Sequence, residues 1–437
     1  MNSNNKYKIG QILDNIKIGD LSYEARGEYR DENNHLILID NALPEEIVKI
    51  QITHTFSKYS IAKVLKRHKD SQIRIQNNDE SYIGAAPLSI ISYEEQLNFK
   101  LRTINNLFKR NLDITIDSIT ESPKQLSYRN KITLFPKLLN NNKMALGIKD
   151  KNLNEIIIPN EYLLANVNIQ KFIKFLNKKI NENFDLFEIF NSCSNIILRS
   201  SNIDNKLQIT INLNKEIRNI NRKIKSLNVI NEYNYSIIIN NTKRQKITIG
   251  NDENIASIDN YKFIMNNDSF FQINEDLTPV LYKSLLDKLD LNENQIIVDA
   301  YCGIGTITLY LAQKSKKVYG LEIIPNAIKN AKQNSIINKV SNAEFIVGDV
   351  SKTISNINEK IDVVVVDPPR IGLDKNFINS IIKISPNEIG YISCNPRTLC
   401  RDLKIFKEHG YEIKYIQGFD MFPQTYHIEM VCVLYKK

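Results

Sequence analysis

Five apolar segments separated by helix-like segments lie between residues 295 and 393, and no other feature of this chain limits its fold so strongly. Strands that are apolar throughout and alternate with helices form a parallel sheet with both faces covered. The predicted strands are 295–301, 317–322, 344–347, 361–366 and 388–393, and helical spacing recurs at 306–313 and 326–337. Two further strand-like segments, 411–418 and 429–435, are expected to form an antiparallel hairpin at one edge. The C-terminal part is therefore predicted to be an α/β domain.

The 437 residues exceed one typical domain, so two or three domains are expected. Residues 1–66 are predicted to form short strands, and turn residues at 41–44 separate the segments 34–39 and 46–54. Cations and aromatic residues interleave here, as in a small β-barrel that contacts sugar-phosphate and stacks on bases. The alternative is a solvated barrel whose aromatic residues are core. Residues 67–265 are predicted to be a mixed α+β central domain with a helix at 93–111 that packs on the catalytic domain, and 266–437 forms that third domain.

The net charge of +9 and the pI of about 9.0 favour polyanionic partners such as nucleic acid, although charge alone is a weak signal. The five cysteines are scattered and contain no Cys-x-x-Cys pair, which argues against a disulfide framework, a zinc site or any other metal site. No stretch resembles a signal peptide or the roughly 20 apolar residues of a membrane helix. We therefore expect a cytoplasmic protein without a membrane contact, and no obligate protein partner is evident.

Acidic residues and glycines follow the first three predicted strands. The first strand ends in Asp299-Ala300-Tyr301-Cys302-Gly303-Ile304-Gly305, where the glycines allow a tight turn close to a ligand. Glu322 ends the second strand, where it can accept hydrogen bonds from ribose hydroxyls, and Asp349 follows the third, where an adenine edge would lie. The third glycine of a dinucleotide fingerprint is missing, and three carboxylates suit an uncharged adenosine better than a pyrophosphate. A generic turn with chance carboxylates is the alternative.

The fourth strand ends in Asp367-Pro368-Pro369-Arg370. Methyltransferases that act on exocyclic amines commonly carry an aromatic residue after the two prolines, so Arg370 argues against amine methylation. Asp367 could accept a hydrogen bond from a pyrimidine ring nitrogen or help to hold a cofactor. A purely structural turn is the alternative.

The fifth strand ends in Ser393-Cys394-Asn395-Pro396-Arg397 and a helix follows it. A cysteine at the mouth of the sheet, just before a helix N-terminus, lies where the helix dipole favours the thiolate. Taken alone, such a cysteine is more often buried filler than a nucleophile. The neighbouring Asp-Pro-Pro-Arg motif favours the nucleophile.

Together these residues resemble the RNA uracil-5-methyltransferase family, in the branch whose N-terminal TRAM domain accompanies methylation of 23S ribosomal RNA. The resemblance covers nearly the whole chain, and the matching segments are 41–45 in the barrel, Tyr128-Arg129-Asn130-Lys131, Phe271-Gln272-Ile273-Asn274, Asp367 to Arg370 and Ser393 to Pro396. It implies a Rossmann-like class I methyltransferase domain with a mostly parallel seven-stranded sheet, behind an OB-like TRAM barrel. It also implies that S-adenosylmethionine is bound by Gln272, Tyr301, Gly303, Glu322, Asp349 and Asp367.

Methylation of carbon 5 of uracil requires a nucleophile from the protein, because carbon 5 itself is too weak a nucleophile to attack a sulfonium methyl group. Addition of the Cys394 thiolate to carbon 6 forms an enolate that is nucleophilic at carbon 5. A general base must later remove the carbon 5 proton. Glu429 is the candidate because it opens the last strand near the same edge, and His427 is the competing base. The target base must leave its stack to reach this pocket.

One departure from the family concerns iron. Many members bind an iron–sulfur cluster through four cysteines, but Ile83-Gly84-Ala85-Ala86, Asn77 and Tyr162 occupy the corresponding places here. We therefore predict that no iron–sulfur cluster is present.

The expected activity is formation of 5-methyluridine in 23S rRNA, as part of rRNA processing. Transfer RNA is the runner-up substrate. A cytidine carbon 5 enzyme is disfavoured because it would carry a cysteine directly after the proline of the Asp-Pro motif. A non-catalytic rRNA-binding assembly factor is the alternative from another class. The sequence leaves open the modified position, the number of sites and the oligomeric state.

Overall fold

A computed structural model describes residues 6–76, 84–149, 155–225, 234–243, 245–251, 253–267 and 269–437. The chain divides into two compact units, one made of residues 1–103, 148–162 and 422–426 and the other of residues 104–147, 163–421 and 427–437. Within the described ranges, no helix combines the length and the apolar character that crossing a membrane requires. The predicted domain boundaries at 66 and 265 are a different division and remain a prediction.

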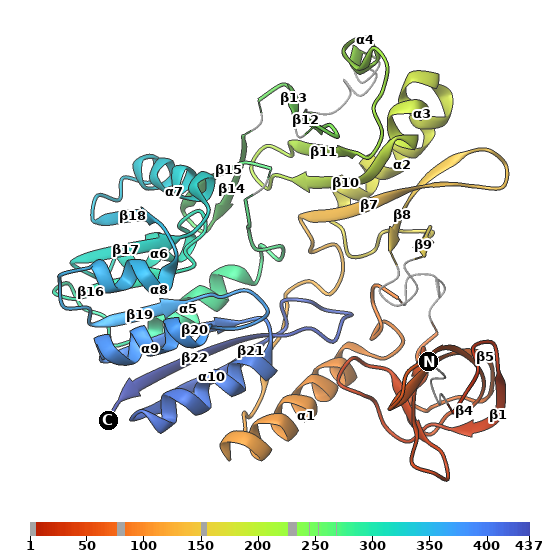
Figure 1. Cartoon of the computed structure of the whole chain (residues 1–437), viewed down its shortest axis with the longest axis horizontal. Helices are drawn as coiled ribbons and strands as arrows, with labels where there is room; N and C mark the ends of the chain where they lie inside the picture. The colour runs from red at the N-terminus through yellow and green to blue at the C-terminus, as the bar shows by residue number, and fades with distance from the viewer. Residues whose placement is uncertain are drawn as a thin grey trace. The chain divides into compact units, whose positions relative to one another are not determined.

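The first unit begins with a curled five-stranded sheet (Figure 1, red). Its strands are β1 (Ile12–Lys17), β2 (Gly27–Arg30), β3 (Leu36–Asp40), β4 (Ile47–Thr55) and β5 (Tyr59–Lys69), in the order β1-β4-β5-β3-β2. Alternate side chains of β3 and β4 point into a core that includes Ile37, Ile39, Val48 and Ile50. Period-two alternation places one face of a strand in the core, which explains why the predicted strands 34–39 and 46–54 are found within two residues of their expected bounds.

A second core cluster of this unit joins residues that are distant in sequence. Phe99, near the start of α1 (Tyr93–Leu112), packs with Leu43, Leu88 and Ile91. The Gln96 side chain, also on α1, donates to the Gln424 side chain over 2.9 Å. The same unit contains the short pairing of Ile148 and Lys149 with β9 (Ile156–Ile157). The helix predicted at 93–111 is confirmed to within one residue.

The second unit contains the central sheet. Its strands are β7 (Lys131–Leu138), β8 (Met144–Lys149), β10 (Cys193–Ser200), β11 (Leu207–Leu213), β12 (Tyr235–Asn240) and β13 (Lys246–Ile249), in the order β13-β12-β11-β10-β7-β8. The helices α2 (Val167–Glu182) and α3 (Phe184–Asn191) accompany it, with the short α4 (Ile220–Lys223). A hairpin of β14 (Asn254–Ile258) and β15 (Tyr261–Met265) leads to the catalytic sheet. Apolar runs of the sequence at 131–135, 195–199, 207–212 and 235–240 all lie within these strands.

The catalytic sheet has the order β18-β17-β16-β19-β20-β22-β21-β6. Its strands are β16 (Ile296–Ala300), β17 (Lys317–Glu322), β18 (Ala343–Val347), β19 (Val363–Val366), β20 (Glu388–Ser393), β21 (Tyr411–Phe419), β22 (Glu429–Lys436) and β6 (Ile119–Thr120). The strands β16 to β20 are parallel, and β22 is antiparallel to both neighbours. The predicted seven strands are therefore joined by an eighth, because β6 from the preceding region pairs with Gly418 and Phe419 of β21.

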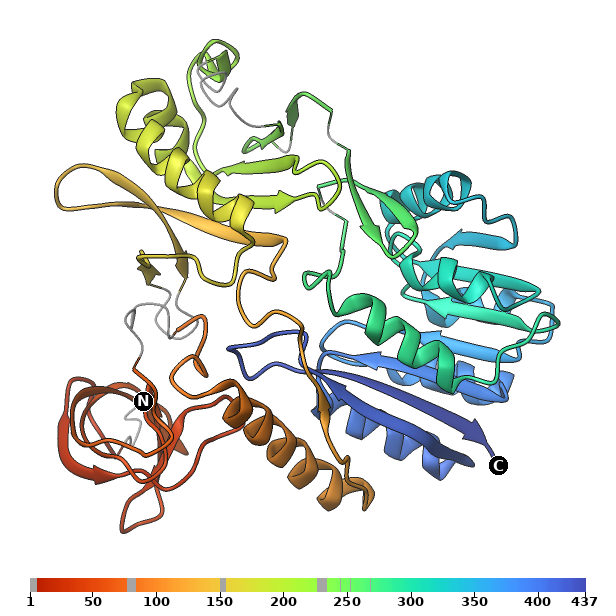
Figure 2. The ribbon, with the colours of Figure 1, turned by 180° about the vertical axis from the view of Figure 1, so that it is seen from behind.

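Helices cover both faces of this sheet, and for that reason all four valines of β19 are buried. Figure 1 shows α8 (Val350–Thr353), α9 (Lys375–Ile384) and α10 (Pro396–Glu408) over one face, and Figure 2 shows α5 (Thr278–Lys288) over the other. The remaining helices are α6 (Thr306–Ala312), α7 (Pro325–Ile337) and the short 3-10 helix η3 (Ile354–Asn356). The carboxyl ends of the five parallel strands thus meet at one edge, which is where ligands bind in such sheets.

Candidate active site

The predicted nucleophile and the predicted base lie on neighbouring strands at this edge. Cys394 directly follows β20, and Glu429 is the first residue of β22. Ser393 pairs with Met430 across the two antiparallel strands. The next residues along each strand toward the edge are Cys394 and Glu429, so the pairing register places their backbones opposite each other. Glu429 is buried and Cys394 is half-buried.

The loop after β16 adopts a tightly turned backbone. Tyr301, Gly303 and Gly305 all have positive φ, at 64°, 56° and 85°. A tyrosine rarely adopts this conformation, and such residues are found where a ligand site over-determines the backbone. At Gly305 an added Cβ would also come within 3.0 Å of the Phe345 ring.

Glu322 fixes this loop from the next strand. One of its carboxylate oxygens accepts from the Gly303 amide over 3.2 Å, and the other accepts from the Ile324 amide over 3.0 Å. Asp349 behaves similarly at the start of α8, where its Oδ1 accepts from the Ser351 amide over 2.9 Å. Hydrogen bonds from Ser351 hold the pKa of Asp349 below its usual value.

A cavity of about 550 Å³ opens beside this loop. Tyr301 and Asp349 line it together with mostly apolar residues, which include Val350, Pro369, Ile371 and Leu373. The Tyr301 ring packs edge-on against Phe377 with 5.6 Å between centroids. An apolar hollow with a carboxylate at its rim fits an adenosine, and the volume lies within the range of cofactor sites.

Asp299 lies on β16, just before the loop that carries Tyr301, and is fully buried. Its Oδ2 accepts from the Thr308 hydroxyl over 2.5 Å, whereas its Oδ1 has no partner within the described part of the chain. Burial raises the pKa of Asp299 to about 7. An unpartnered buried acceptor is costly unless a ligand satisfies it, which supports a bound group with a donor at this place.

The acids around the proposed nucleophile have raised pKa values. Burial raises the pKa of the Cys394 thiol to about 11, and the neighbouring Glu429 and Asp367 add to the rise. The pKa of Glu429 lies well above its usual value for the same reason of burial, reinforced by Asp367. Burial also raises the pKa of Asp367 itself. At neutral pH the free protein therefore holds Cys394 and Glu429 mainly in their protonated forms, whereas Asp367, whose pKa is raised to about 7, is partly ionised.

The expectation that the helix dipole favours the Cys394 thiolate is not met. The helix α10 does begin two residues after the cysteine, at Pro396. Its N-cap is Asn395, whose Oδ1 accepts from the Arg397 amide over 3.2 Å. Burial next to two carboxyl groups outweighs the dipole, and the free protein holds a thiol.

Arg370 is a site residue whose role the sequence did not reveal. Its guanidinium contacts the Cys394 side chain and lowers the pKa of both Cys394 and Glu429. The same guanidinium lies 2.6 Å from His427 Nδ1. His427 thus stands at the site, next to the cation of Arg370. The position of Arg370 directly after the two prolines was the available signal.

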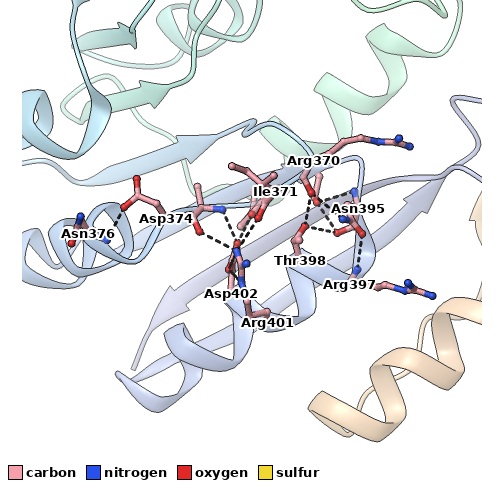
Figure 3. Close-up of polar contacts among 12 residues, drawn as sticks. Arg370, Ile371, Asp374, Asn376, Asn395, Arg397, Thr398, Arg401 and Asp402 are labelled. Atoms are coloured by element: carbon pink, nitrogen blue, oxygen red, sulfur yellow. Dashed lines mark hydrogen bonds and ion pairs between the residues drawn. The ribbon is translucent and has the colours of Figure 1, made fainter. Parts of the chain in front are cut away.

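The loop that carries Arg370 is held by α10, as Figure 3 shows. The Arg370 carbonyl accepts from Asn395 Nδ2 over 2.9 Å. Arg401 Nη2 donates to the carbonyls of Ile371 and Leu373 over 3.1 and 3.0 Å. The buried Asp402 accepts from the Leu373 amide over 2.9 Å. The helix α10 thereby fixes the loop after β19 relative to Cys394, which lies directly before α10.

Gln272 lies apart from these strands, in the segment between β15 and α5, and is buried. Of the positions expected to replace cluster cysteines, Tyr162 is buried, whereas Asn77 and Ile83 lie outside the described residues. Within the described part of the chain, no group of three or more His, Cys, Asp or Glu residues is arranged to hold a metal ion.

Comparisons with known proteins agree with this geometry. The family model described as tRNA (Uracil-5-)-methyltransferase matches residues 92–437. The chain is 34% identical to an uncharacterised RNA methyltransferase of Lactiplantibacillus plantarum, over 97% of both chains. It is also 34% identical to one of Clostridium tetani, over 92% of both. The solved structure of Pyrococcus abyssi tRNA (uracil-54, C5)-methyltransferase with S-adenosyl-L-homocysteine shares the fold. The TM-score is 0.74 at 23% identity, over 97% of this chain and 100% of that one.

Proposed function

The chain belongs to the tRNA (uracil-5-)-methyltransferase family, and from this premise we propose that its substrate is a specific uridine of 23S rRNA. Family membership makes it an S-adenosylmethionine-dependent RNA uracil-5-methyltransferase. The choice of rRNA rests on the TRAM-like barrel at residues 12–69, which characterises the rRNA branch that the sequence resembles. Exposed Phe56, stacked on Tyr59 at 4.7 Å between centroids, is a suitable platform for an unpaired base.

Transfer RNA is the second candidate, and a specific observation favours it. The Pyrococcus abyssi enzyme acts on uracil 54 of tRNA, and its structure matches 97% of this chain. A non-catalytic assembly factor is disfavoured, because such a factor has no need of a cysteine and a carboxyl group held on adjacent strands.

We propose that Tyr301, Gly303, Glu322, Asp349, Asp367 and Gln272 hold the cofactor. S-adenosylmethionine, when bound, supplies the methyl group. Glu322 and Asp349 would accept hydrogen bonds from the ribose and the adenine, and Tyr301 lines the cavity beside them. The unpartnered oxygen of Asp299 would accept a further donor. All of these positions lie in the second unit.

The observation that supports the mechanism is the register of β20 and β22, whose last pair, Ser393 and Met430, directly adjoins the cysteine and the carboxyl group. The Cys394 thiol first loses its proton to solvent. The thiolate then forms a bond to carbon 6 of the uracil, and the electron pair of the carbon 5–carbon 6 double bond becomes an enolate. Carbon 5 would take up the methyl group that the bound cofactor supplies. Glu429, in its ionised form, then removes the carbon 5 proton, the double bond re-forms, and the bond from carbon 6 to sulfur breaks, which returns the thiolate.

The raised pKa values fit these two roles. A thiol with a raised pKa gives a more nucleophilic thiolate once its proton is lost. A carboxylate with a raised pKa is a stronger base than an ordinary one. Arg370 limits the rise in the pKa of Cys394 and in the pKa of Glu429. It lies where it can stabilise negative charge on sulfur or on the enolate.

We further propose that the protein acts in the cytoplasm and without an iron–sulfur cluster. Purified protein is then expected to be colourless, with no stoichiometric iron when it is prepared anaerobically. Iron at four atoms per chain, with a visible absorption band, would contradict this part of the proposal.

The substrate is tested by transfer of a labelled methyl group to unmodified 23S rRNA and, in parallel, to unmodified tRNA. The product nucleoside is identified by mass spectrometry. We expect 5-methyluridine in the rRNA alone. The same product in tRNA alone would preserve the reaction and overturn the substrate, and no product in either RNA would contradict the activity.

A further inference from the structure

The segment that carries Gln272 is anchored to the central sheet by side chains that are not themselves placed at the cofactor. This Gln272 segment, residues 269–275, runs between β15 and α5, and within the described residues its one strand-like pairing is a single bridge of Asn274 with Arg129. A segment without regular structure needs other hydrogen bonds to fix its backbone. Two buried residues of the central sheet, Asn130 and Arg199, supply them.

Asn130 directly precedes β7 and is 3% exposed. Its side-chain amide donates twice, to the Gln272 carbonyl over 3.0 Å and to Glu275 Oε1 over 2.8 Å. Its backbone amide donates to the Ile273 carbonyl over 3.1 Å, and its own carbonyl accepts from the Ser200 amide over 2.9 Å. Three successive contacts to residues 272–275 therefore come from one asparagine.

Arg199, on the neighbouring strand β10, fixes the start of the same segment. It is also 3% exposed, and its Nη2 donates to the Ser269 carbonyl over 2.6 Å. Its Nη1 lies 3.4 Å from the Asn266 carbonyl. Because β7 and β10 pair at Lys131 and Arg199, Asn130 and Arg199 leave the sheet side by side.

The far side of the segment is held by the catalytic part of the same unit. Asn274 is fully buried, and its Nδ2 donates to the Met421 carbonyl over 3.2 Å, in the loop between β21 and β22. Asn330 of α7 donates to the Ser269 hydroxyl over 3.0 Å. The Gln272 segment is thus clamped between the central sheet and the elements that carry Glu429.

We infer that Asn130 and Arg199 are positioning residues for S-adenosylmethionine binding, since they fix the peptide from which the Gln272 side chain projects. This inference rests on the proposed role of Gln272 in holding the cofactor. Asn130 and Arg199 donate to the backbone carbonyls of Gln272, Ile273 and Ser269, so these contacts set the backbone position of the segment. The central domain then completes the cofactor site in addition to any contact with RNA.

The test compares S-adenosylmethionine affinity of the full-length chain, without RNA, among the wild type and the variants Asn130→Ala, Gln272→Ala and Asn168→Ala. Titration calorimetry gives each Kd, and melting temperatures monitor folding. Asn168 is the matched control, because its side-chain amide also donates twice, to Ser200 Oγ and the Asn205 carbonyl, but does not touch the Gln272 segment. We expect Kd to rise roughly tenfold in Asn130→Ala and Gln272→Ala, and to stay within about twofold in Asn168→Ala.

The Kd values of the three variants distinguish failure of the positioning role from failure of the proposed role of Gln272. If Gln272→Ala weakens binding but Asn130→Ala does not, the positioning role is overturned and the role of Gln272 stands. If Gln272→Ala leaves the Kd unchanged, the proposed role of Gln272 fails, and the inference with it. An equal effect of Asn168→Ala and Asn130→Ala would reduce both to general loosening of the central sheet, which contradicts the inference.

A second variant, Asn130→Asp, preserves the shape of the side chain and so protects the test against misfolding. It replaces two donors by a carboxylate that faces Glu275. The groups around Glu275 are Asn130, Asp276 and Lys124, and burial raises its pKa to about 7. Kd for S-adenosylmethionine in this variant should therefore rise more at pH 8, where both carboxyls are ionised, than at pH 6. A pH-independent Kd in Asn130→Asp would contradict the clamp.

Discussion

The acidic residues at the edge of the catalytic sheet differ according to the strand that carries them. Glu322 at the end of β17 and Asp349 two residues after β18 accept hydrogen bonds from backbone amides, and the pKa of Asp349 is lowered. Half-buried Asp367 directly after β19 and buried Glu429 at the start of β22 both have raised pKa values. The sheet edge thus has carboxylates fixed by hydrogen bonds on the side proposed to hold the cofactor. On the other side it has acids with raised pKa values next to a thiol.

This difference teaches how one sheet edge separates binding from chemistry. Backbone amides compensate the negative charges of buried Glu322 and exposed Asp349, so this side is fixed before any ligand arrives. On the reaction side, Arg370 supplies a positive charge. Substitutions on the binding side should therefore change affinity, and substitutions on the reaction side should change rate.

The largest effect is expected from Cys394→Ala. Without a thiolate no enolate can form, so single-turnover methylation should fall by roughly 10⁴-fold or more. Affinity for S-adenosylmethionine should change by less than about twofold, because the cysteine lies on the reaction side. Rapid-quench assays and calorimetry measure the two quantities. Unchanged turnover in this variant would remove covalent catalysis from the account.

The next largest effect is expected from Glu429→Gln. The amide is nearly isosteric but cannot remove the carbon 5 proton, so turnover should fall by about 10²- to 10⁴-fold. The blocked step comes after methyl transfer, and a covalent protein–RNA species should therefore accumulate on denaturing gels. The matched variant His427→Gln should show no such species. Accumulation in His427→Gln instead would exchange the roles of the two residues.

An effect on affinity alone is expected from Glu322→Gln. The substitution removes a charged acceptor from the Gly303 and Ile324 amides, so Kd for S-adenosylmethionine should rise about ten- to a hundredfold. The rate of a single turnover at saturating cofactor should stay close to that of the wild type. A large loss of that rate would contradict the assignment of cofactor binding to one side of the sheet edge and of the reaction to the other.

The smallest effect is expected from Arg370→Met in the free protein. The pKa of Cys394 is about 11 in the presence of Arg370, so alkylation by iodoacetamide should accelerate roughly tenfold for each pH unit between 7 and 10. Without the cation the pKa rises further, and alkylation at a fixed pH should slow about three- to tenfold. Arg370→Lys, which retains the charge, is the matched control. Faster alkylation in Arg370→Met would contradict the inference that Arg370 lowers the pKa of Cys394.

Sequence reasoning predicted the parallel sheet and the residues at its edge, because strand ends in such sheets converge by geometry alone. It placed Cys394 and Glu429 correctly at neighbouring strand ends. The eighth strand, β6, was not predictable, since two residues carry no periodicity and their pairing with β21 spans about 300 positions. The sign of the thiol pKa was also missed, because it depends on burial by distant segments rather than on the local helix. The contacts of Asn130 with the Gln272 segment were not predictable either, because they also join residues that are distant in sequence.

The most direct test of the account is a search for the covalent intermediate in RNA that contains 5-fluorouridine. Fluorine at carbon 5 cannot be removed by a base, so elimination is blocked after methyl transfer. In the presence of S-adenosylmethionine, we predict that a methylated fluorouridine adduct is retained on the peptide that contains Cys394, as located by mass spectrometry after digestion. An adduct on another cysteine, or turnover of normal RNA without any adduct, would contradict nucleophilic catalysis by Cys394.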